Sequence, residues 1–312
     1  MEVVKDSPLL KFNPNTIEEV RKELKLDHDE IITMLDNFEE WILKQNHFIT
    51  KEFSRRYLEL SIIYAKGSLE RAKKNLDKLC TLKTLLPSFF SKHDTKKQLI
   101  DTSAFTLRVS LTKDNYRVYM IKIVSTDCDS SGIFDFYRFG TLTGEYVKIH
   151  DYAHGLIAVV DCRDVNIISL VTKINVVDLR NSMSVLMEGY GLRMKGIHIL
   201  SSSKAIDAFV AVLKQVVSAK IGSRISVHKS LDSLYEIVPK EMLPKDYGGD
   251  EMSLKEIYGT IIWHVYVTAN SRSAATPSFS RVQLGKAGHM RLNLDVSYLS
   301  SVRTRLSLHH SG

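Results

Sequence analysis

Cysteine is scarce in this 312-residue chain, and long apolar runs are absent. Cys80, Cys128 and Cys162 are an odd number at spacings that fit no metal site, so a reduced, cytoplasmic protein is expected. Every apolar run is interrupted well short of the roughly 20 residues that span a bilayer. The first ten residues lack the basic region and apolar core of a signal peptide. We therefore expect membrane contact to be peripheral.

Catalytic signatures are also missing. The chain has no Gly-x-Ser-x-Gly elbow, no phosphate-binding glycine loop with Lys-Ser/Thr and no His-Glu-x-x-His motif. His150 and His154 are four residues apart near Asp151 and Asp161, but no third ligand follows at a fixed spacing, so structural or solvated histidines are favoured over a metal site. Asp161 could serve as a base, yet its position at a strand end favours a capping role. We predict a protein that is not an enzyme.

Charge is unevenly distributed. The chain is 44% hydrophobic and 25% charged, which is ordinary for a soluble globular protein, and its formal net charge is +7. Residues 270–312 hold six Lys/Arg and one acid, so +5 of that charge lies in a serine-rich tail with no persistent amphipathic period. We predict that this tail is poorly ordered. The basic balance weakly favours an anionic partner, although an ordinary basic protein would look the same.

The first ninety residues show helical periodicity. Thr16 is the expected N-cap of a first helix, and Asp29-Glu30 precede an apolar stripe at helical spacing. Ser68 follows Gly67 and is expected to start another helix, and Pro87 ends this segment. Residues 1–95 are therefore predicted to form an all-helical module with no chemistry of its own.

From about residue 100, short β-rich runs alternate with helical ones, which predicts an α/β fold with a mixed, largely parallel sheet and crossover helices. This second domain is predicted to span residues 96–250, with a C-terminal helix over 251–269. The expected strands are Arg117–Val124, Leu156–Cys162, Leu192–Leu200 and Arg224–His228. The expected helices are Ile167–Gly189, Ser203–Lys220, Ser230–Val238 and Met252–Val265.

Two pairs of cations have spacings that could build one anion site. Arg193 and Lys195 are two residues apart in an expected strand, so both side chains fall on one face. Lys220 and Arg224 are four apart at the end of a helical pattern and share a face too. Between the pairs, Ser203–Lys220 is apolar nearly all round, which fits either a core helix or a lid that faces a cavity on one side and a bilayer on the other.

Several motifs resemble the CRAL-TRIO lipid-binding family, in particular its tocopherol-transfer and clavesin branch. The resemblance rests on an ordered string over some sixty residues and extends to roughly residues 15–265. The matching segments are Arg193-Met-Lys195-Gly-Ile-His198, Lys220-Ile-Gly-Ser-Arg224-Ile-Ser-Val-His228, Leu243-Pro244 and Tyr247-Gly248-Gly249. The chain departs from the family in having Gly191 after Tyr190 and the triplet Ser201-Ser202-Ser203 before the apolar helix. These departures bear on the hinge of a gate and leave the fold unchanged.

The resemblance implies a site as well as a fold. It makes Ser203–Lys220 a mobile lid over a lipid pocket, and it makes Arg193, Lys195, Lys220 and Arg224 a phosphoinositide-binding site. The implied pocket residues are all apolar or aromatic: Val185, Leu186, Tyr190, Ile197, Phe209, Leu213 and Val217.

The expected function follows from these two sites. We predict a monomeric, cytoplasmic lipid-transfer protein that carries one tocopherol-, retinoid- or carotenoid-like molecule. It would use no cofactor, bind no nucleic acid and exchange its lipid at phosphoinositide-containing membranes. The alternative is a phosphoinositide-binding adaptor in membrane trafficking that transfers nothing.

Overall fold

The computed structural model describes residues 9–91, 103–126 and 130–257, without the side chains of residues 103–110 and 130. All of them belong to one compact unit, residues 1–282, and a second unit covers 283–312. The predicted tail, most of the predicted helix over 251–269 and the segment that joins the two predicted domains lie outside the described residues. The domain boundaries therefore stay predictions.

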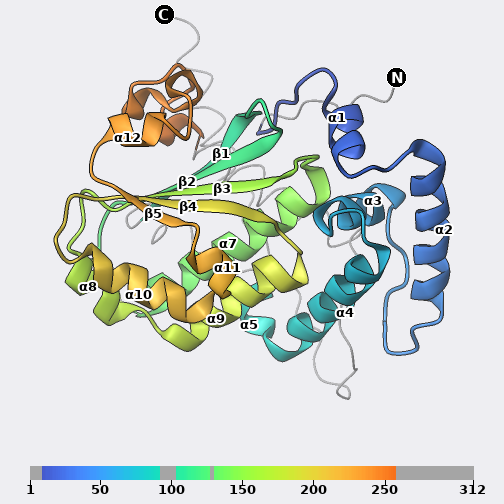
Figure 1. The fold of residues 1–312 in the computed structure, drawn as a ribbon. Coiled ribbons are helices and arrows are strands. Elements are labelled where there is room, and N and C mark those ends of the chain that lie inside the picture. The colour runs from blue at the N-terminus through green and yellow to red at the C-terminus, as the bar shows by residue number, and fades with distance from the viewer. Residues whose placement is uncertain (1–8, 92–102, 127–129, 258–312) are drawn as a thin grey trace, which may run out of the picture. The chain divides into compact units, whose positions relative to one another are not determined.

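The N-terminal part is helical, as predicted (Figure 1). Asp27 and Glu30 form a capping box in which each side chain accepts a hydrogen bond from the other's backbone N–H, and Ser54 and Ser68 cap the next two long helices. The prediction for Thr16 was wrong. Asn15 is the N-cap, while Thr16 is buried in the first turn and donates its hydroxyl to the carbonyl of Asn13. The helices are α1 (Thr16–Glu23), α2 (His28–Leu43), α3 (Arg55–Tyr64), α4 (Leu69–Leu85) and α5 (Pro87–Phe90).

A five-stranded sheet follows, with its strands side by side in chain order. The first pair is antiparallel and the other three pairs are parallel, so the sheet is mixed and largely parallel, as predicted. The middle strand is buried along its whole length, which a strand covered by helices on both faces requires. The strands are β1 (Ser103–Leu111), β2 (Tyr116–Ile123), β3 (Gly155–Asp161), β4 (Met194–Leu200) and β5 (Ile225–His228).

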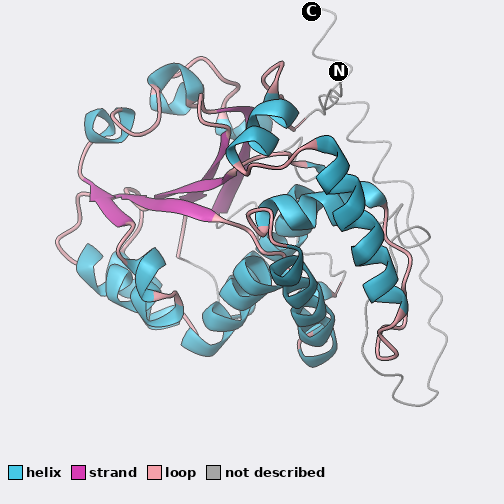
Figure 2. Cartoon of the chain, turned by 45° about the vertical axis from the view of Figure 1, so that its right-hand side comes forward, coloured by secondary structure: helices cyan, strands magenta, loops and turns pink. Residues whose placement is uncertain are grey.

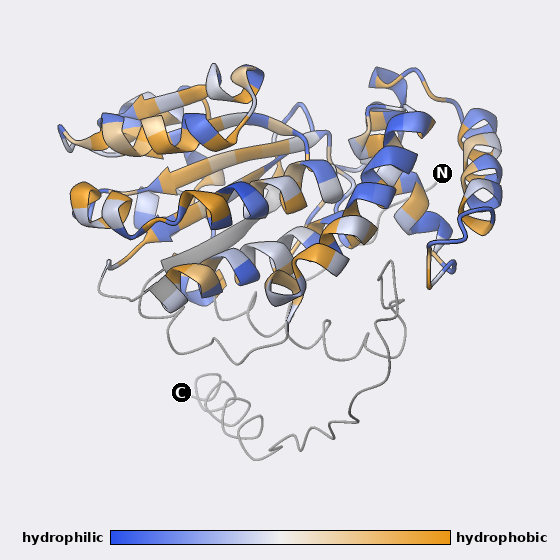
Figure 3. Cartoon of the chain, turned by 90° about the horizontal axis from the view of Figure 1, so that it is seen from below, coloured by the Kyte–Doolittle hydropathy of each residue, from blue (hydrophilic) through white to orange (hydrophobic). Residues whose placement is uncertain are grey.

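Helices cover both faces of this sheet (Figures 1 and 2). One face packs against α12 (Leu231–Tyr235) and the Leu-Pro-Lys-Asp-Tyr-Gly-Gly segment that follows it. The longer helices lie on the other face, and in Figure 3 the strands between the two layers are mainly hydrophobic. The helices of this second face are α7 (Ser130–His150), α8 (Ile167–Lys173), α9 (Val176–Ser184), the π-helical turn η1 (Val185–Gly189), α10 (Ile206–Val216) and α11 (Ala219–Gly222).

Two elements were missed and two predicted helices need correction. The sequence indicated neither the strand β1 nor α7, the longest helix in the described part of the chain. The predicted helix Ile167–Gly189 is broken at Asn175, whose side chain accepts hydrogen bonds from two backbone N–H groups and caps α9. The predicted helix Ser203–Lys220 ends at Val216, because Ser218 caps the separate turn α11.

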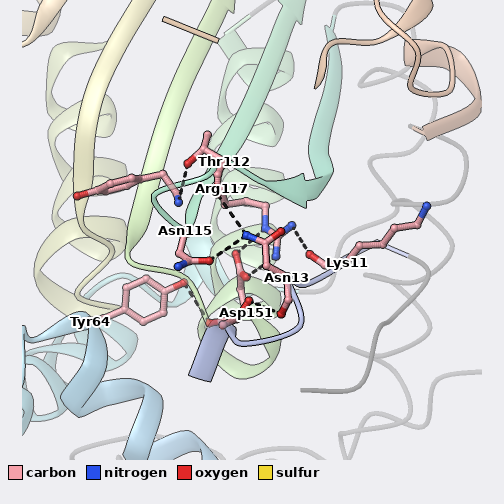
Figure 4. Close-up of polar contacts among 9 residues, drawn as sticks. Lys11, Asn13, Tyr64, Thr112, Asn115, Arg117 and Asp151 are labelled. Atoms are coloured by element: carbon pink, nitrogen blue, oxygen red, sulfur yellow. Dashed lines mark hydrogen bonds and ion pairs between the residues drawn. The ribbon is translucent and has the colours of Figure 1, made fainter. Parts of the chain in front are cut away.

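A buried ion pair ties the N-terminal segment to the sheet (Figure 4). The guanidinium of Arg117 on β2 donates hydrogen bonds of 3.0 and 2.7 Å to the carboxylate of Asp151, and a third of 3.1 Å to the carbonyl of Lys11. Neither charged side chain is exposed. Tyr64 of α3 donates to the backbone carbonyl of Asp151 at 3.3 Å. The helical part and the sheet are therefore joined through one polar centre.

Candidate functional site

A cavity of about 200 Å³ lies between the sheet and the helices on its longer-helix face. This volume is more than ten times the roughly 10–15 Å³ that one water molecule needs. Strands β2, β3 and β4 form its floor, and α7, α8, α9, η1 and α10 form its walls. Its lining consists mainly of aliphatic and aromatic side chains, which is typical of a site for an apolar small molecule.

Four of the seven predicted pocket residues line this cavity: Leu186, Ile197, Phe209 and Leu213. The other three are not among its lining residues. Val185 and Tyr190 are buried in a neighbouring apolar cluster with Leu79 and Tyr146, and Val217 lies beyond the end of α10.

Residues of β2 and α7 make up much of the rest of the lining, and none of them was expected. Three glycines of α7, Gly132, Gly140 and Gly144, line the cavity. A methyl group on Gly140 would meet no atom within 4 Å, whereas one on Gly144 would come within 2.6 Å of a methyl carbon of Leu186. The missing side chain of Gly140 therefore leaves open space.

The predicted lid corresponds to α10, which packs on α8 and α9. Ile206 and Phe209 are buried, while Ala211 is exposed and Val210 and Leu213 are half-buried. Phe209 and Leu213, one turn apart, are the residues that α10 contributes to the cavity. The serine triplet before α10 is ordered by its own hydroxyls: Ser201 accepts from the N–H of Ser203, and Ser203 accepts from that of Ala205.

Three of the four predicted cations gather around a lysine from the helical part. Lys66 lies in the turn between α3 and α4, and its pKa is lowered, first by the charge of Arg193, then by burial and by the charges of Lys220, Arg71 and Arg224. Among the described residues, no carboxylate lies within 4.0 Å of any of these five cations. We call Lys66, Arg71, Arg193, Lys220 and Arg224 the basic cluster.

Lys195 has a different neighbourhood. Its ammonium lies 4.8 Å from the centre of the Tyr116 ring, which stacks on His154. Burial is the main reason that the pKa of His154 is lowered; Arg193 and Lys195 lower it further, whereas Glu23 opposes the shift. Arg193 acts on both Lys66 and His154, so it is the member of the basic cluster that adjoins Lys195, and three of the four predicted cations belong to the cluster while Lys195 lies beside it.

The residues considered as metal ligands or as a base are held by contacts with neighbouring side chains. Asp151 is held by Arg117, and Glu23 lies 2.6 Å from Nδ1 of His154 without hydrogen-bond geometry. Burial raises the pKa of Asp161, but hydrogen bonds from Arg163 and Tyr247 outweigh it, so the pKa is below its ordinary value. Within the described ranges, no three potential ligands are close enough to hold a metal ion. No helix in the same part of the chain is long and apolar enough to cross a bilayer.

Comparison with known proteins adds a family and several relatives. The model of the CRAL/TRIO domain family matches residues 93–249, about half of the chain. Proteins named "Alpha-tocopherol transfer protein-like" from Homo sapiens and Pongo abelii are 29% identical over 89 residues, and the one from Mus musculus is 30% identical over 89 residues. These matches cover 28% of this chain and 25% of each relative, so the chain spans about a quarter of the length of these relatives.

A likeness to a solved structure is weaker. The protein in "Crystal structure of Sfh5" is 10% identical, with a TM-score of 0.48, over 67% of this chain and 78% of that chain.

Proposed function

The chain belongs to the CRAL/TRIO domain family, and we propose that it is a lipid-transfer protein. In this proposal it carries one hydrophobic molecule in its cavity and exchanges it at membranes that contain phosphoinositides. It acts as a monomer in the cytoplasm and binds those membranes peripherally. Its cargo is a tocopherol-, retinoid- or carotenoid-like lipid, and no catalytic step is involved. The observation that carries the proposal is the apolar cavity walled by α7, α8, α9 and α10.

Energetics favour exchange over simple uptake. Each buried CH₂ gains roughly 0.8 kcal/mol on leaving water, but a lipid that leaves a bilayer loses about as much. The cavity therefore competes with the membrane on nearly equal terms, and its task is to shield the lipid from water between membranes. A carrier of this kind needs a wall that can open at the membrane surface.

We assign this opening to α10, which contributes Phe209 and Leu213 to the cavity. Ala211 on the same helix is exposed, and Val210 is half-buried. Ile168 on α8 and Val177 on α9 are large apolar side chains, 56% and 61% exposed, on the two helices that α10 contacts. These apolar residues fit a surface that meets a bilayer when α10 moves.

The basic cluster supports the choice of membrane. Its like charges lower the pKa of Lys66, so a bound anion would relieve their mutual repulsion. Guanidinium groups suit phosphate oxygens because they can donate two parallel hydrogen bonds, and ammonium groups add point charges. Arg193 precedes β4, and Lys220 and Arg224 follow α10, so a phosphate bound across them would sense the position of that helix.

The same cluster leaves one rival. An adaptor that reads phosphoinositides without moving lipid would need the basic cluster and not the cavity. Purified protein is therefore tested in two assays: native mass spectrometry for a bound lipid, and transfer of a fluorescent lipid between vesicles with and without phosphoinositide. We expect one lipid per chain and faster transfer to the phosphoinositide vesicles. Headgroup binding with an empty cavity and no transfer would instead establish the adaptor.

A further inference from the structure

One charged residue, Lys173, lines the otherwise uncharged cavity in the described part of the chain. It is the last residue of α8, and its ammonium donates a hydrogen bond to the backbone carbonyl of Thr126. No carboxylate of the described residues lies within 4.0 Å of it. An ammonium group has three N–H donors, and one of them is used here. Among the described residues, Lys173 therefore contributes a positive charge to the cavity with N–H donors left for a ligand.

Lys173 marks one end of the cavity. Ser125 and Thr126, which follow β2, line that end together with Ile123 and Ile174. Leu156 and Met194 line the opposite end, where β3 and β4 begin. The strands of the floor are parallel, so Ser125, Thr126 and Lys173 lie at their carboxyl ends. Tyr119, Tyr137 and Thr143 also line the cavity, so the positive charge of Lys173 is what distinguishes this end.

We propose that the cavity takes a single-chain lipid with an anionic headgroup, a carboxylate or a phosphate monoester, that pairs with Lys173. The tail lies along β2 towards Leu156 and Met194. This inference rests on the proposed lipid-transfer function and changes its cargo from a neutral tocopherol- or carotenoid-like lipid to an acidic one. It also separates the cargo site from the basic cluster, which lies at the amino end of β4 and contains none of the cavity's lining residues.

The physical reason is the cost of an unpaired charge. An ammonium at an apolar wall is unfavourable unless a counter-charge or hydrogen-bond acceptors replace water. A neutral lipid that fills the cavity displaces water and leaves Lys173 with the Thr126 carbonyl as its acceptor among the described residues. An anionic headgroup supplies the missing charge and accepts the remaining N–H groups in strong, charge-assisted hydrogen bonds.

The length of β2 along the cavity limits the length of the lipid tail. Arg117 of β2 pairs with Leu156, and Ile123 lies six residues further along, which corresponds to roughly 20 Å of strand. An extended chain advances about 1.2 Å per bond, so roughly sixteen carbon–carbon bonds fit this length. Palmitate and 1-hexadecanol are therefore suitable probes, because they share a sixteen-carbon chain and differ in charge.

The test offers the full-length protein an equimolar mixture of palmitate and 1-hexadecanol and measures the bound ratio by native mass spectrometry. We expect wild-type protein to prefer palmitate at least tenfold. Lys173→Met should lower this preference about tenfold or more, and Lys173→Arg should keep it. Lys214→Met is the matched control: it removes a last-turn lysine from α10, outside the cavity, and should bind like wild type. Circular dichroism verifies that each variant is folded.

Hexadecyl phosphate in place of palmitate distinguishes the two headgroups, because the preferred one shows the larger dependence on Lys173. Equal binding of acid and alcohol to wild-type protein would overturn this inference and leave lipid transfer standing. An unchanged preference in Lys173→Met would do the same. If none of the probes binds, the anionic-lipid site is wrong, and the proposed lipid transfer is decided separately by the native mass spectrometry and vesicle-transfer assays described above.

Discussion

Nδ1 of His198 lies 3.0 Å from Nε2 of His228, and both rings are buried between β4 and β5. One nitrogen of such a pair must donate and the other must accept, so the contact is satisfied when both rings are neutral. Burial first, and the neighbouring His228 second, lower the pKa of His198 to about 4. The pKa of His228 is lowered as well, mainly by burial. The contact between the two rings therefore makes the pairing of β4 with β5 depend on pH.

The free energy of unfolding should decrease as the pH falls from about 6.5 to 4. An unfolded histidine titrates near 6.5, so between about pH 6.5 and 4 the unfolded chain binds more protons than the folded one. The stability is fully present above pH 6.5 and is lost as the pH falls towards 4. Urea unfolding at pH 7 and pH 5 measures the loss. His198→Gln should make the two values more alike, whereas His28→Gln, at an exposed position, should not. If both variants lost the same free energy of unfolding between pH 7 and pH 5, this pH dependence could not be assigned to His198.

The Arg117–Asp151 pair should be costly to break. Asp151→Asn leaves the guanidinium buried without its counter-charge, because neither side chain is exposed. We expect a loss of roughly 3–5 kcal/mol in the free energy of unfolding, measured with urea. Glu40→Gln, which removes the acid from the exposed pair with Lys44, serves as the control and should cause no measurable change. A small effect of Asp151→Asn would show that water reaches Arg117.

A charge inside the cavity should abolish binding of an apolar lipid. Leu213→Asp places a carboxylate on the part of α10 that lines the cavity, at a cost of several kcal/mol to a bound apolar tail. We expect the affinity for a fluorescent lipid analogue to fall more than tenfold while circular dichroism stays native. Gln215→Asp adds the same charge at an exposed position of the same helix and should bind normally. Equal binding by the two variants would place the lipid elsewhere.

The basic cluster should control membrane binding and not lipid affinity. Arg193→Ala combined with Arg224→Ala should weaken binding to phosphoinositide vesicles about thirtyfold, at about 1 kcal/mol per charge, and should reduce its salt sensitivity. Lys66→Ala should weaken it about fivefold, because its charge lies among the others. Lys74→Ala, an exposed lysine of α4, is the control. Vesicle sedimentation at two salt concentrations is the measurement, and unchanged binding by the double variant would move the site away from this cluster.

Two glycines one turn apart should respond differently to the same substitution. Gly140→Ala adds a methyl group where no atom lies within 4 Å, so the helix should gain up to about 1 kcal/mol from the better propensity of alanine. Gly144→Ala brings that methyl group to 2.6 Å from Leu186 and should lose the gain through crowding. Thermal unfolding compares them. A lower melting temperature for Gly140→Ala would show that the space there is not open.

The four strands β2 to β5 could be predicted from the sequence to within about two residues, because short β-branched runs mark a buried parallel sheet, but the antiparallel edge strand β1 was not predicted. The long helix α7 could not. Gly140 and Gly144 weaken its helical signal, and their small size is what the neighbouring cavity and Leu186 require. The breaks at Asn175 and Ser218 carried a usable signal, since both residues cap the helix that follows.

The candidate site, too, could be predicted from the sequence only in part. Leu186, Ile197, Phe209 and Leu213 lie on elements that the resemblance had identified, and they line the cavity. Lys173 gave no signal, because one lysine inside the expected helix Ile167–Gly189 looks like any solvated residue. Its position is set by the loop after β2, whose carbonyl it binds. Lys66 gave no signal either, because the influence of Arg193 on it depends on how the helical part packs on the sheet.

The hydrogen bond from Arg117 to the carbonyl of Lys11 also has a consequence for synthesis on the ribosome. Lys11 is made 140 residues before Asp151, the residue that completes this ion pair. At roughly 5–20 residues per second, that interval lasts about 7 to 28 s. Leu9 and Leu10, which end up buried beside Val185 and Tyr190, must wait longer still. Leu9 and Leu10 are therefore synthesised well before their partners, and in that interval this apolar pair is exposed to chaperones and to aggregation.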